Sequence, residues 1–448
     1  MTALHLDLDS VIPPYPICYV STFPPRRCGL GTFLSNLMTG VDSTGMRGHV
    51  IAISDQPGYS YGLEVIGEIR QNCPTDYRGA ADYLNRTRIP VVNLHHEYGI
   101  FGGEYGSYVL EFSERLERPL VVTLHTILSD PLPDHRRIIQ GLASTARALV
   151  VMTECGRELL VSRYTVDPQL VHVIPHGVPA VRAWSRREIR RPLGLAGREV
   201  LCTFGLINPG KGIEFMLHAL PGVVARHPRV VYLVLGQTHP VVKRLYGEAY
   251  REHLIQLATQ LGISAHVQFV DTYLSEAELT DYLLATDVYV TPYLGVDQIV
   301  SGTLAYAVGL GKAIVSTPYL YAQELLGQRR GLLVPFRDPE ALENALNRIL
   351  GSAHLRYLLQ KRALSLGITM TWPRVGARYA SLFREVMGRS TVYERIPRFT
   401  VGPPATANGL HGNHPTRHLF AAGPGQRVHH GRQRQGLAHA DESAGRAN

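Results

Sequence analysis

Residues 289–336 restrict the fold more than any other stretch, because they have the pattern of one unit of a parallel sheet. An apolar run is followed by a polar loop at 294–302, a helix of small residues at 303–310, a second apolar run at 313–316 and, after a turn, a third. Strand, loop, helix and strand in this order form a βαβ unit. The loop offers backbone amides and the helix N-terminus adds partial positive charge, so the stretch predicts a site for an anion or a sugar hydroxyl.

Short apolar runs alternate with helical segments twice along the chain, at 15–180 and at 199–350. Each series is typical of an open parallel sheet with helices on both faces. The sequence therefore predicts an α/β fold with two doubly wound domains in tandem. Ligands of such sheets bind at the carboxyl ends of the strands, so the residues that follow the apolar runs are the natural site residues.

The predicted organisation places two domains between a short extension and a tail. A late helix is expected to pack back across the domain boundary, and the tail has too few apolar residues to build a core, so we expect it to be disordered. The predicted parts are an N-terminal extension at 1–14, a first Rossmann-like domain at 15–195, a second at 196–370, a crossover helix at 371–390 and a tail rich in His, Gly and Arg at 400–448.

Composition argues against several classes of protein. The 448 residues carry a net charge of +8 but no basic stripe interleaved with aromatic residues, so nucleic-acid binding is not expected. The five cysteines are scattered and odd in number, which favours reduced thiols in a cytoplasmic protein. No run of about 18 apolar residues is present, so no membrane-spanning helix is expected. The N-terminus lacks the pattern of a signal peptide.

Glycine and polar residues follow the apolar runs of the first domain. Gly29 and Gly31 lie in a turn between an apolar run and a helix, where glycine lets the backbone approach a ligand. Thr32 is placed to cap that helix. His125 ends another run, and it either contacts a ligand or is a hydrogen-bonded core histidine.

His95, His96 and Glu97 end a third run and suggest a metal site. Adjacent residues of a strand point to opposite faces, so the two histidines cannot both ligate one ion readily. The HExxH pattern is absent, and no cysteine pair has the spacing of a zinc site. We therefore expect no metal.

In the second domain Lys211 lies in a glycine-containing loop just before a helix. A lysine in this place is suited to meet a phosphate, and the alternative is a solvated loop lysine. Further along the chain, Ser275 and Glu278 have the spacing of a capping box and predict the start of a helix.

Taken together, these motifs resemble the retaining glycosyltransferases of family 4, which have the GT-B fold of two Rossmann-like domains facing across a cleft. The resemblance covers about Tyr15 to Gly388. It rests on GLG at 29–31, VTLH at 122–125, VIPHGV at 173–178, GLINPGKG at 205–212, DVYVTPY at 287–293, GLGKAIVSTP at 309–318, QELL through RGLLVPFRDPEAL at 323–342, and the Thr-Trp pair at 371–372.

The resemblance implies a hexosyltransferase that moves mannose or glucose from a nucleotide-diphosphate sugar to a glycan, lipid or small-molecule acceptor, with no metal or other cofactor. The first domain would bind the acceptor, through His95, His96 and Glu97, and the second domain the nucleotide sugar. His125 and Lys211 would act at the reaction centre. The residues implied to bind the donor and its phosphates are Gly29, Gly31, Gly205, Lys211, Gln298, Ser301, Gly302, Thr303 and Tyr306.

Three positions depart from the family pattern. Leu206 stands where the family carries an Arg, directly after the glycine that matches Gly205. Gln298 and Tyr306 stand at the two positions of a Glu-x7-Glu pair. The spacing of this stretch is similar to that in starch and glycogen synthases, and SGT at 301–303 is similar to the phosphate-facing SGT of glycan phosphorylases.

Arg26 or Arg27, beside the first glycines, is expected to replace the missing phosphate contact from the facing domain. Two other functions stay open: a phosphorylase that uses inorganic phosphate, indicated by SGT, and a non-catalytic glycan- or nucleotide-binding protein, indicated by the lost carboxylates. The expected location is the cytoplasm. The basic segment Arg186–Arg191 leaves peripheral contact with the inner membrane face open.

Overall fold

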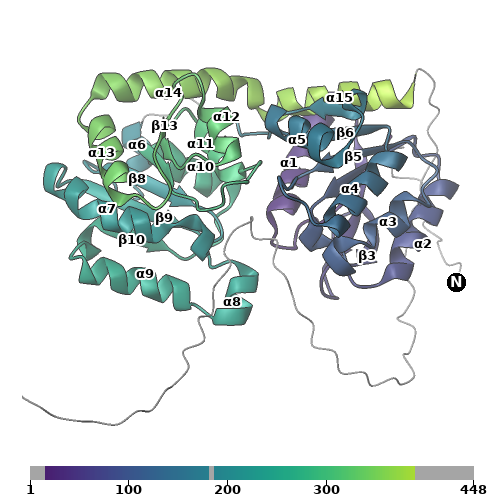
Figure 1. Ribbon diagram of the computed structural model, residues 1–448, viewed down its shortest axis with the longest axis horizontal. Coiled ribbons are helices and arrows are strands. Elements are labelled where there is room, and N and C mark those ends of the chain that lie inside the picture. Colours follow the sequence, from purple (N-terminus) through teal and green to yellow (C-terminus); the bar gives the residue numbers. More distant parts are fainter. Residues whose placement is uncertain (1–15, 181–185, 389–448) are drawn as a thin grey trace, which may run out of the picture.

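The computed structural model describes residues 16–180 and 186–388, which form two domains side by side (Figure 1). The first domain is built on a seven-stranded sheet in the order β3-β2-β1-β4-β5-β6-β7, and each adjacent pair is parallel. Its strands are β1 (Ile17–Ser21), β2 (Gly48–Ser54), β3 (Val65–Arg70), β4 (Val91–His96), β5 (Leu120–Leu124), β6 (Ala148–Val151) and β7 (Val171–Val173).

The second domain has a six-stranded sheet in the order β10-β9-β8-β11-β12-β13, again with parallel pairs. In both sheets the chain starts near the middle, builds one edge and then returns to build the other, which is the doubly wound order. The predicted α/β fold with two Rossmann-like domains is confirmed. The strands of the second sheet are β8 (Glu199–Phe204), β9 (Val230–Leu235), β10 (Val267–Val270), β11 (Val288–Thr291), β12 (Ala313–Ser316) and β13 (Leu332–Leu333).

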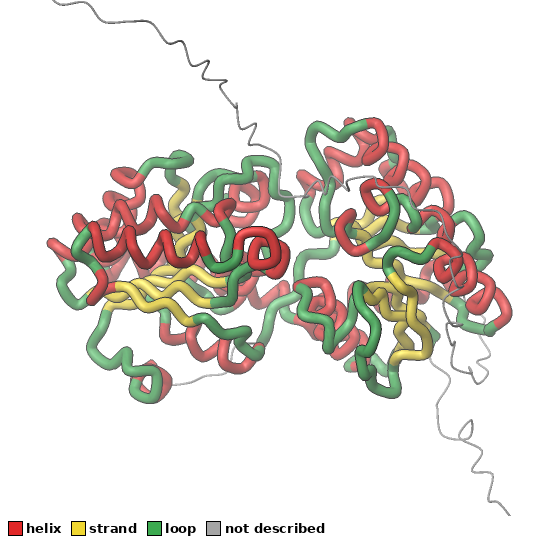
Figure 2. Tube along the Cα trace, turned by 90° about the horizontal axis from the view of Figure 1, so that it is seen from below, coloured by secondary structure: helices red, strands yellow, loops and turns green. Residues whose placement is uncertain are grey.

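Helices cover the faces of the two sheets (Figure 2). Those packed on the first sheet are α1 (Gly29–Asp42), α2 (Pro74–Arg86), α3 (Val109–Ser113), α4 (Pro133–Thr145), α5 (Glu154–Tyr164) and α15 (Trp372–Met387). The second domain carries α6 (Arg186–Arg190), α7 (Ile213–Arg226), α8 (Pro240–Tyr246), α9 (Ala249–Gln260), α10 (Glu276–Ala285), α11 (Gly302–Gly309), α12 (Leu320–Leu326), α13 (Pro339–Leu350) and α14 (Ala353–Gly367).

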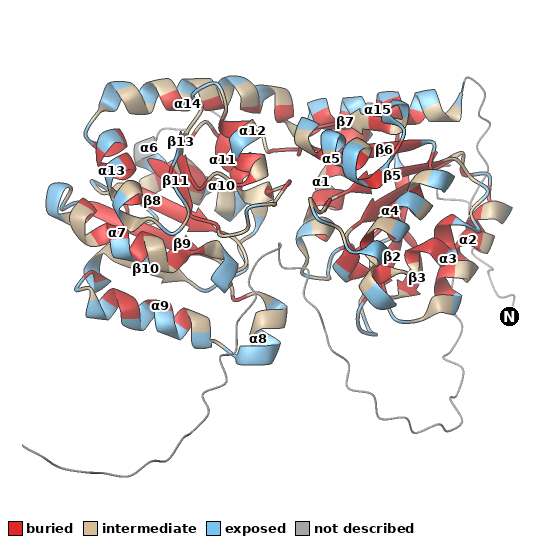
Figure 3. Cartoon of the chain, viewed as in Figure 1, coloured by how far each residue is buried: buried red, intermediate tan, exposed pale blue. Residues whose placement is uncertain are grey.

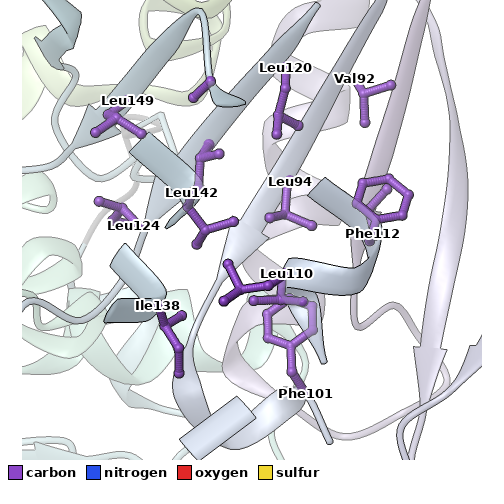
Figure 4. Packing of buried hydrophobic residues seen from close by; sticks show 14 of the residues in the cluster. Val92, Leu94, Phe101, Leu110, Phe112, Leu120, Leu124, Ile138, Leu142 and Leu149 are labelled. Carbon is purple, nitrogen blue, oxygen red and sulfur yellow. The ribbon is translucent and has the colours of Figure 1, made fainter. Parts of the chain in front are cut away.

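The central strands are buried along their whole length because helices cover both of their faces (Figure 3). On one face of the first sheet, Leu94 of β4 and Leu124 of β5 pack with Phe112 of α3 and Ile138 of α4 (Figure 4). The opposite face lies under α1 and α15. The carboxyl ends of the strands carry the residues that the sequence singled out.

The last described helix, α15, packs on the first domain although it follows the second in the chain (Figure 1). Gly40 of α1 and Gly376 of α15 let the two backbones touch, since a Cβ atom at Gly376 would lie 2.1 Å from the carbonyl carbon of Gly40. The two segments that cross between the domains also pair with each other. Val178 donates to the Met370 carbonyl at 2.9 Å and accepts from the Trp372 N–H at 3.0 Å.

Several predictions about local structure were wrong. Thr32 does not cap α1: the helix begins at Gly29, and the Thr32 N–H already donates within it to the Cys28 carbonyl at 3.2 Å. The prediction placed the glycines in the preceding turn because glycine is a poor helix former. The helices α3, α4, α5, α8, α12 and α14 were not predicted individually. In α14 the apolar residues are spread around the helix and form no narrow stripe.

The basic segment at 186–191 contains α6. Arg190 of α6 donates to the Ala285 carbonyl and to the Asp287 carboxylate at 2.6 Å, which ties the segment to the second domain. The capping box of Ser275 and Glu278 is confirmed at the start of α10. The exact domain limits stay predictions, and the predicted extension at 1–14 and tail at 400–448 lie outside the described residues. None of the helices in the described ranges has the length and apolar character that a membrane crossing needs.

Candidate active site

Lys211 lies at the end of a single 3₁₀ turn (Pro209–Lys211) in the loop between β8 and α7. Its Nζ donates to the Tyr293 hydroxyl at 2.7 Å and lies 3.9 Å from the centroid of the same ring. Burial of the ammonium group lowers the pKa of Lys211 to about 7. The loop needs glycine at Gly205, which has a φ of +129° and whose Cβ would lie 3.2 Å from Thr303. Lys211 is therefore half-buried beside Thr303 and is not a fully solvated loop lysine.

The N-terminus of α11 adjoins this lysine. Ser301 is the N-cap residue, and its Oγ accepts from the Leu304 N–H at 3.3 Å. The Thr303 hydroxyl lies 2.7 Å from the Tyr293 hydroxyl and 3.0 Å from that of Ser301. The N–H groups of Gly302 and Thr303 have no hydrogen-bond partner among the described residues. A cation and two unpaired backbone N–H groups side by side suit an anion.

On the first domain, Phe33 of α1 gathers the aromatic residues that face this helix. Its ring centroid lies 4.8 Å from that of His125, 5.0 Å from His176 and 5.2 Å from Trp372. Gly29 and Gly31 form the first turn of the same helix rather than a free loop. A Cβ at Gly31 would lie 3.4 Å from the backbone of Phe23, so glycine here serves close packing of the helix start.

His176 completes the contact between the domains, and it was not among the predicted site residues although it lies in VIPHGV. Its Nδ1 donates to the Gly177 carbonyl at 2.6 Å. Its Nε2 faces the second domain, since a Cβ on Gly302 would lie 3.0 Å from it. Burial lowers the pKa of His176 to about 4, so the ring is neutral near pH 7. A sequence search that followed every quoted motif to its polar residue would have found it.

His125 directly follows β5, and its ring bonds to that of His95. The His95 Nδ1 and His125 Nε2 atoms are 3.1 Å apart, and the His95 Nε2 lies 2.9 Å from the Asn93 Oδ1. Burial lowers the pKa of His95 to about 3 and that of His125 well below its usual value. His125 is thus a hydrogen-bonded, half-buried histidine at the end of the strand, and its contact with a ligand stays a prediction.

The three residues predicted on the acceptor side do not lie together. His96 points to the other face of the sheet, where its ring stacks on Phe101 at a centroid distance of 5.7 Å. This is the alternation expected of strand neighbours. Glu97 follows the strand, and its carboxylate accepts from the Tyr98 N–H at 3.1 Å and from the Thr126 hydroxyl. Burial raises the pKa of Glu97.

Tyr306 and Gln298, which replace the family's Glu pair, have protein partners. The Tyr306 hydroxyl donates to the Glu276 carboxylate at 2.8 Å, and Asn36 of α1 donates to the same carboxylate oxygen at 3.1 Å and to Tyr306 at 3.2 Å. A carboxylate from α10 therefore stands next to the residue that departs from the pattern. Gln298 donates to the Val300 carbonyl at 2.8 Å and braces its own loop.

Arg26 does not point toward the second domain. Its guanidinium donates to the Ile53 carbonyl at 3.0 Å and to the Gln71 side chain at 3.1 Å, both in the first domain. Arg27 does reach across, because its guanidinium lies 5.8 Å from the ring centroid of Tyr273. A separate contact holds the domains together elsewhere: the carboxylate of Glu324 on α12 accepts from the first two N–H groups of α5 at 2.9 and 3.0 Å.

No group of three or more metal-ligating side chains is found within residues 16–180 and 186–388. The site is instead made of one lysine, a helix N-terminus, hydroxyl groups and neutral imidazoles. Two doubly wound domains that bring such groups together at the carboxyl ends of their strands have the GT-B architecture.

Comparison with known proteins identifies the family. Residues 29–182 match the family model described as Glycosyltransferase Family 4, and residues 198–352 match the model described as Glycosyl transferases group 1. The two matches together cover more than half of the chain. The chain therefore belongs to glycosyltransferase family 4, and it is a glycosyltransferase.

Curated relatives are similar over much of the chain. The D-inositol 3-phosphate glycosyltransferase of Corynebacterium efficiens is 26% identical over 333 residues, which cover 68% of this chain and 74% of the relative. The phosphatidyl-myo-inositol mannosyltransferase of Mycolicibacterium smegmatis is 26% identical over 284 residues, covering 61% and 66%. A D-inositol 3-phosphate glycosyltransferase of Rhodococcus jostii is matched over only 46% of its length.

The fold is shared with solved structures. Anabaena Alr3699/HepE, solved in complex with UDP, superposes with a TM-score of 0.65 at 16% identity, covering 82% of this chain and 99% of that one. The same protein has been solved with UDP-glucose. At this identity the likeness shows the GT-B fold alone.

Proposed function

We propose that this protein moves a hexosyl unit from a nucleotide-diphosphate sugar to an acceptor with retention of anomeric configuration. The observation that carries the proposal is the anion site formed by Lys211 and the unpaired N–H groups of Gly302 and Thr303. Departure of the nucleotide diphosphate puts negative charge on its oxygens, and donors fixed in advance at that place lower the barrier. The roles given to the individual residues are part of the proposal.

The protonation state of Lys211 can respond to the charge of the bound ligand. With a pKa of about 7 it is half protonated near neutral pH in the empty site, and an arriving diphosphate favours the charged form. His125 packs on Phe33, whose ring also meets His176 beside the α11 N-terminus, and we assign His125 to the donor sugar. The scheme uses no metal ion.

The Tyr306–Glu276 pair supports a nucleotide at this site. The carboxylate of Glu276 accepts from Tyr306 and Asn36 through one oxygen, Oε1. A carboxylate oxygen is the ordinary acceptor for the hydroxyls of a ribose. We expect Glu276 to take over, from another helix, the role that the family assigns to the second Glu of its missing pair.

The first donor to test is UDP-glucose and the first acceptor an inositol phosphate. UDP-glucose is bound by the structurally similar Anabaena protein, and the curated relatives are named for inositol-based acceptors. GDP-mannose is the second donor to test. A lipid-linked acceptor would bring the protein to a membrane surface, although Arg190 of the basic segment is bound to Asp287 and offers no free charge there.

A thermal-shift screen with UDP, GDP and ADP tests the donor site. A nucleotide at about 100 times its Kd stabilises the native state by about 2.7 kcal/mol, so one of the three is expected to raise the Tm clearly. Transfer is then followed by NMR, which reports the anomeric configuration of the product. Lys211→Met is expected to remove the shift. A screen in which no nucleotide raises the Tm contradicts the proposal.

Two further outcomes identify the other functions. Release of a sugar 1-phosphate that depends on inorganic phosphate would identify a phosphorylase. A clear thermal shift without transfer to any acceptor, and without slow hydrolysis of the donor, would identify a non-catalytic binding protein.

A further inference from the structure

We propose that Asn93 and His95 are positioning residues that fix the tautomer of His125, so that His125 presents a bare Nδ1 atom and accepts a hydrogen bond from a hydroxyl group of the bound sugar. These residues belong to a file of uncharged polar groups inside the first domain. The file runs from Tyr379 of α15 through Thr123 and Asn93 to His95 and His125. That the ligand is a sugar rests on the proposed function; the tautomer does not.

The orientation of the Asn93 amide is settled by its neighbours. Asn93 is fully buried, and one end of its amide lies 3.1 Å from the Val121 carbonyl oxygen and 3.2 Å from the Thr123 hydroxyl. A carbonyl oxygen can only accept, so the amide nitrogen must lie at this end. The amide oxygen then faces the His95 Nε2 at 2.9 Å, and this ring nitrogen must carry a proton.

The tautomer of His95 determines which ring nitrogen of His125 carries a proton. The residue is fully buried, and its desolvation lowers the pKa to about 3, so the ring carries a single proton near pH 7. Because that proton is on Nε2, the Nδ1 atom of His95 is bare and accepts. The nitrogen that faces it at 3.1 Å is Nε2 of His125, which must therefore donate.

His125 is left with one bare nitrogen. Burial and the neighbouring imidazoles of His95, His176 and His96 lower its pKa well below the usual value, so the ring is neutral and Nδ1 has no proton. Nδ1 has no hydrogen-bond partner among the described residues. The ring itself cannot turn freely, because Phe33 meets it edge-on at a centroid distance of 4.8 Å.

An acceptor-only nitrogen selects the group that it binds. A hydroxyl can donate to Nδ1, whereas a phosphate or carboxylate oxygen would place two lone pairs against each other. His125 is thereby assigned to the sugar and not to the diphosphate, whose charge is met by Lys211. A neutral imidazole also avoids adding positive charge next to an anomeric carbon that becomes positive during transfer.

The strand pattern places these residues on one face. Asn93 and His95 are two apart on β4, and Thr123 of β5 is in register with His95. That face is covered by α1 and α15, which keep water from the file and fix its far end through Tyr379. Leucine would fill the space at these buried positions equally well, so packing alone does not account for the polar side chains.

Histidine tautomers can be observed directly in the full-length protein without any ligand. Two-bond ¹H–¹⁵N NMR correlation spectra of protein labelled with ¹⁵N-histidine separate protonated from bare ring nitrogens, and His95→Gln and His125→Gln assign the signals. We expect both rings to be protonated at Nε2 near pH 7. His176, whose Nδ1 donates to a carbonyl, serves as an internal reference of the opposite tautomer. A proton on Nδ1 of His125 overturns the proposal, whatever the activity.

Asn93→Leu removes the amide that starts the chain of constraints. His95 is then free to protonate either nitrogen, and we expect the His125 spectrum to show a growing fraction protonated at Nδ1. Asn347→Leu makes the same change at another buried asparagine, in the second domain, and is expected to leave the His125 signals unchanged. An unchanged His125 spectrum in Asn93→Leu contradicts the positioning role. If this variant does not fold, the wild-type spectrum still decides the tautomer.

Affinity measurements with UDP-glucose and UDP test the sugar contact separately from the rest of the site. Loss of one neutral hydrogen bond, worth about 1 kcal/mol, corresponds to a loss in affinity of about fivefold. Asn93→Leu is expected to weaken the binding of UDP-glucose by about fivefold, while the affinity for UDP changes less than twofold. Equal weakening of both probes would overturn the assignment of His125 to the sugar. If UDP-glucose does not bind the wild-type protein, the proposed donor is wrong and the NMR result alone decides the tautomer.

Discussion

Lys211 makes the nucleotide affinity of this protein depend on pH in a direction that can be worked out. Its ammonium group is buried against Tyr293, and burial lowers its pKa from 10.5 to about 7. The charged form, which a diphosphate needs, dominates below pH 7 and is lost as the pH rises through 7. UDP is itself fully ionised above this pH, so the change on the protein controls the binding.

The size of the effect follows from the pKa. At about pH 9 only about 1% of Lys211 carries the proton in the empty site, so binding must also supply it. Each unit well above the pKa costs about 1.4 kcal/mol, and because half of Lys211 is already deprotonated at pH 7, UDP binding at about pH 9 is up to roughly 50-fold weaker than at pH 7. Binding near pH 8 should take up close to one proton per site.

Isothermal titration calorimetry measures both quantities. Kd is followed from about pH 6.5 to 9, and proton uptake is obtained by repeating one titration in buffers of different ionisation enthalpy. Lys211→Met keeps most of the side-chain volume without the charge, and should bind weakly at every pH. Uridine, which lacks phosphates but shares the uracil ring, is the ligand control, and the slope of UDP beyond that of uridine is assigned to Lys211. A wild-type Kd that stays constant over this range, or a slope that survives in Lys211→Met, refutes the assignment of Lys211 to the diphosphate.

Three other substitutions test the architecture. Gly302→Ala places a methyl group 3.0 Å from the Nε2 of His176 and should weaken the binding of UDP by about three- to tenfold in calorimetry. The Tm should change by no more than the modest effect of alanine in a helix. An unchanged Kd would mean that this end of α11 does not meet the ligand. Glu324→Gln leaves an amide that can accept only one of the two hydrogen bonds from α5. We expect a larger radius of gyration by small-angle X-ray scattering and a loss of about 1 kcal/mol in the free energy of unfolding. An identical scattering profile would show that this contact does not hold the domains together. Gly376→Ala puts a Cβ 2.1 Å from the α1 backbone, which cannot move aside as a flexible side chain would, and should destabilise the protein by about 1–3 kcal/mol in urea unfolding. Gly29→Ala, with nothing within 4 Å of the new atom, should leave the stability unchanged. Equal stability of the two variants would count against close packing of α1 and α15.

The sequence predicted the fold well where one physical rule decided the outcome. Buried parallel strands are mostly apolar on both faces, so the apolar runs within 289–336 located β11, β12 and β13. A capping box satisfies the first N–H groups of a helix, so Ser275 located α10. Where no such rule dominates, as in the evenly mixed α14, the pattern gave no prediction.

The candidate site was predicted only in part, because sequence spacing places residues at strand ends but does not say which side chains meet. The nearness of Lys211 and Thr303 follows from the pairing of β8 with β11, and both were predicted. Asn93, Tyr293 and Glu276 were missed, since their contacts depend on strand register and on how α10 meets the other domain. These are long-range contacts that no local motif encodes.

The place of α15 has a consequence for how the molecule is made. The first seven strands leave the ribosome early, yet one face of their sheet, with Ile17 and Val121 upon it, is covered in part by Tyr379 and Phe383 of a helix that is synthesised after the whole second domain. A nascent chain must therefore carry an unfinished apolar surface while the whole second domain is synthesised, in the interval when aggregation competes with folding. A first domain expressed without the rest of the chain should keep that defect permanently, and it should recover solubility when α15 is fused directly behind β7.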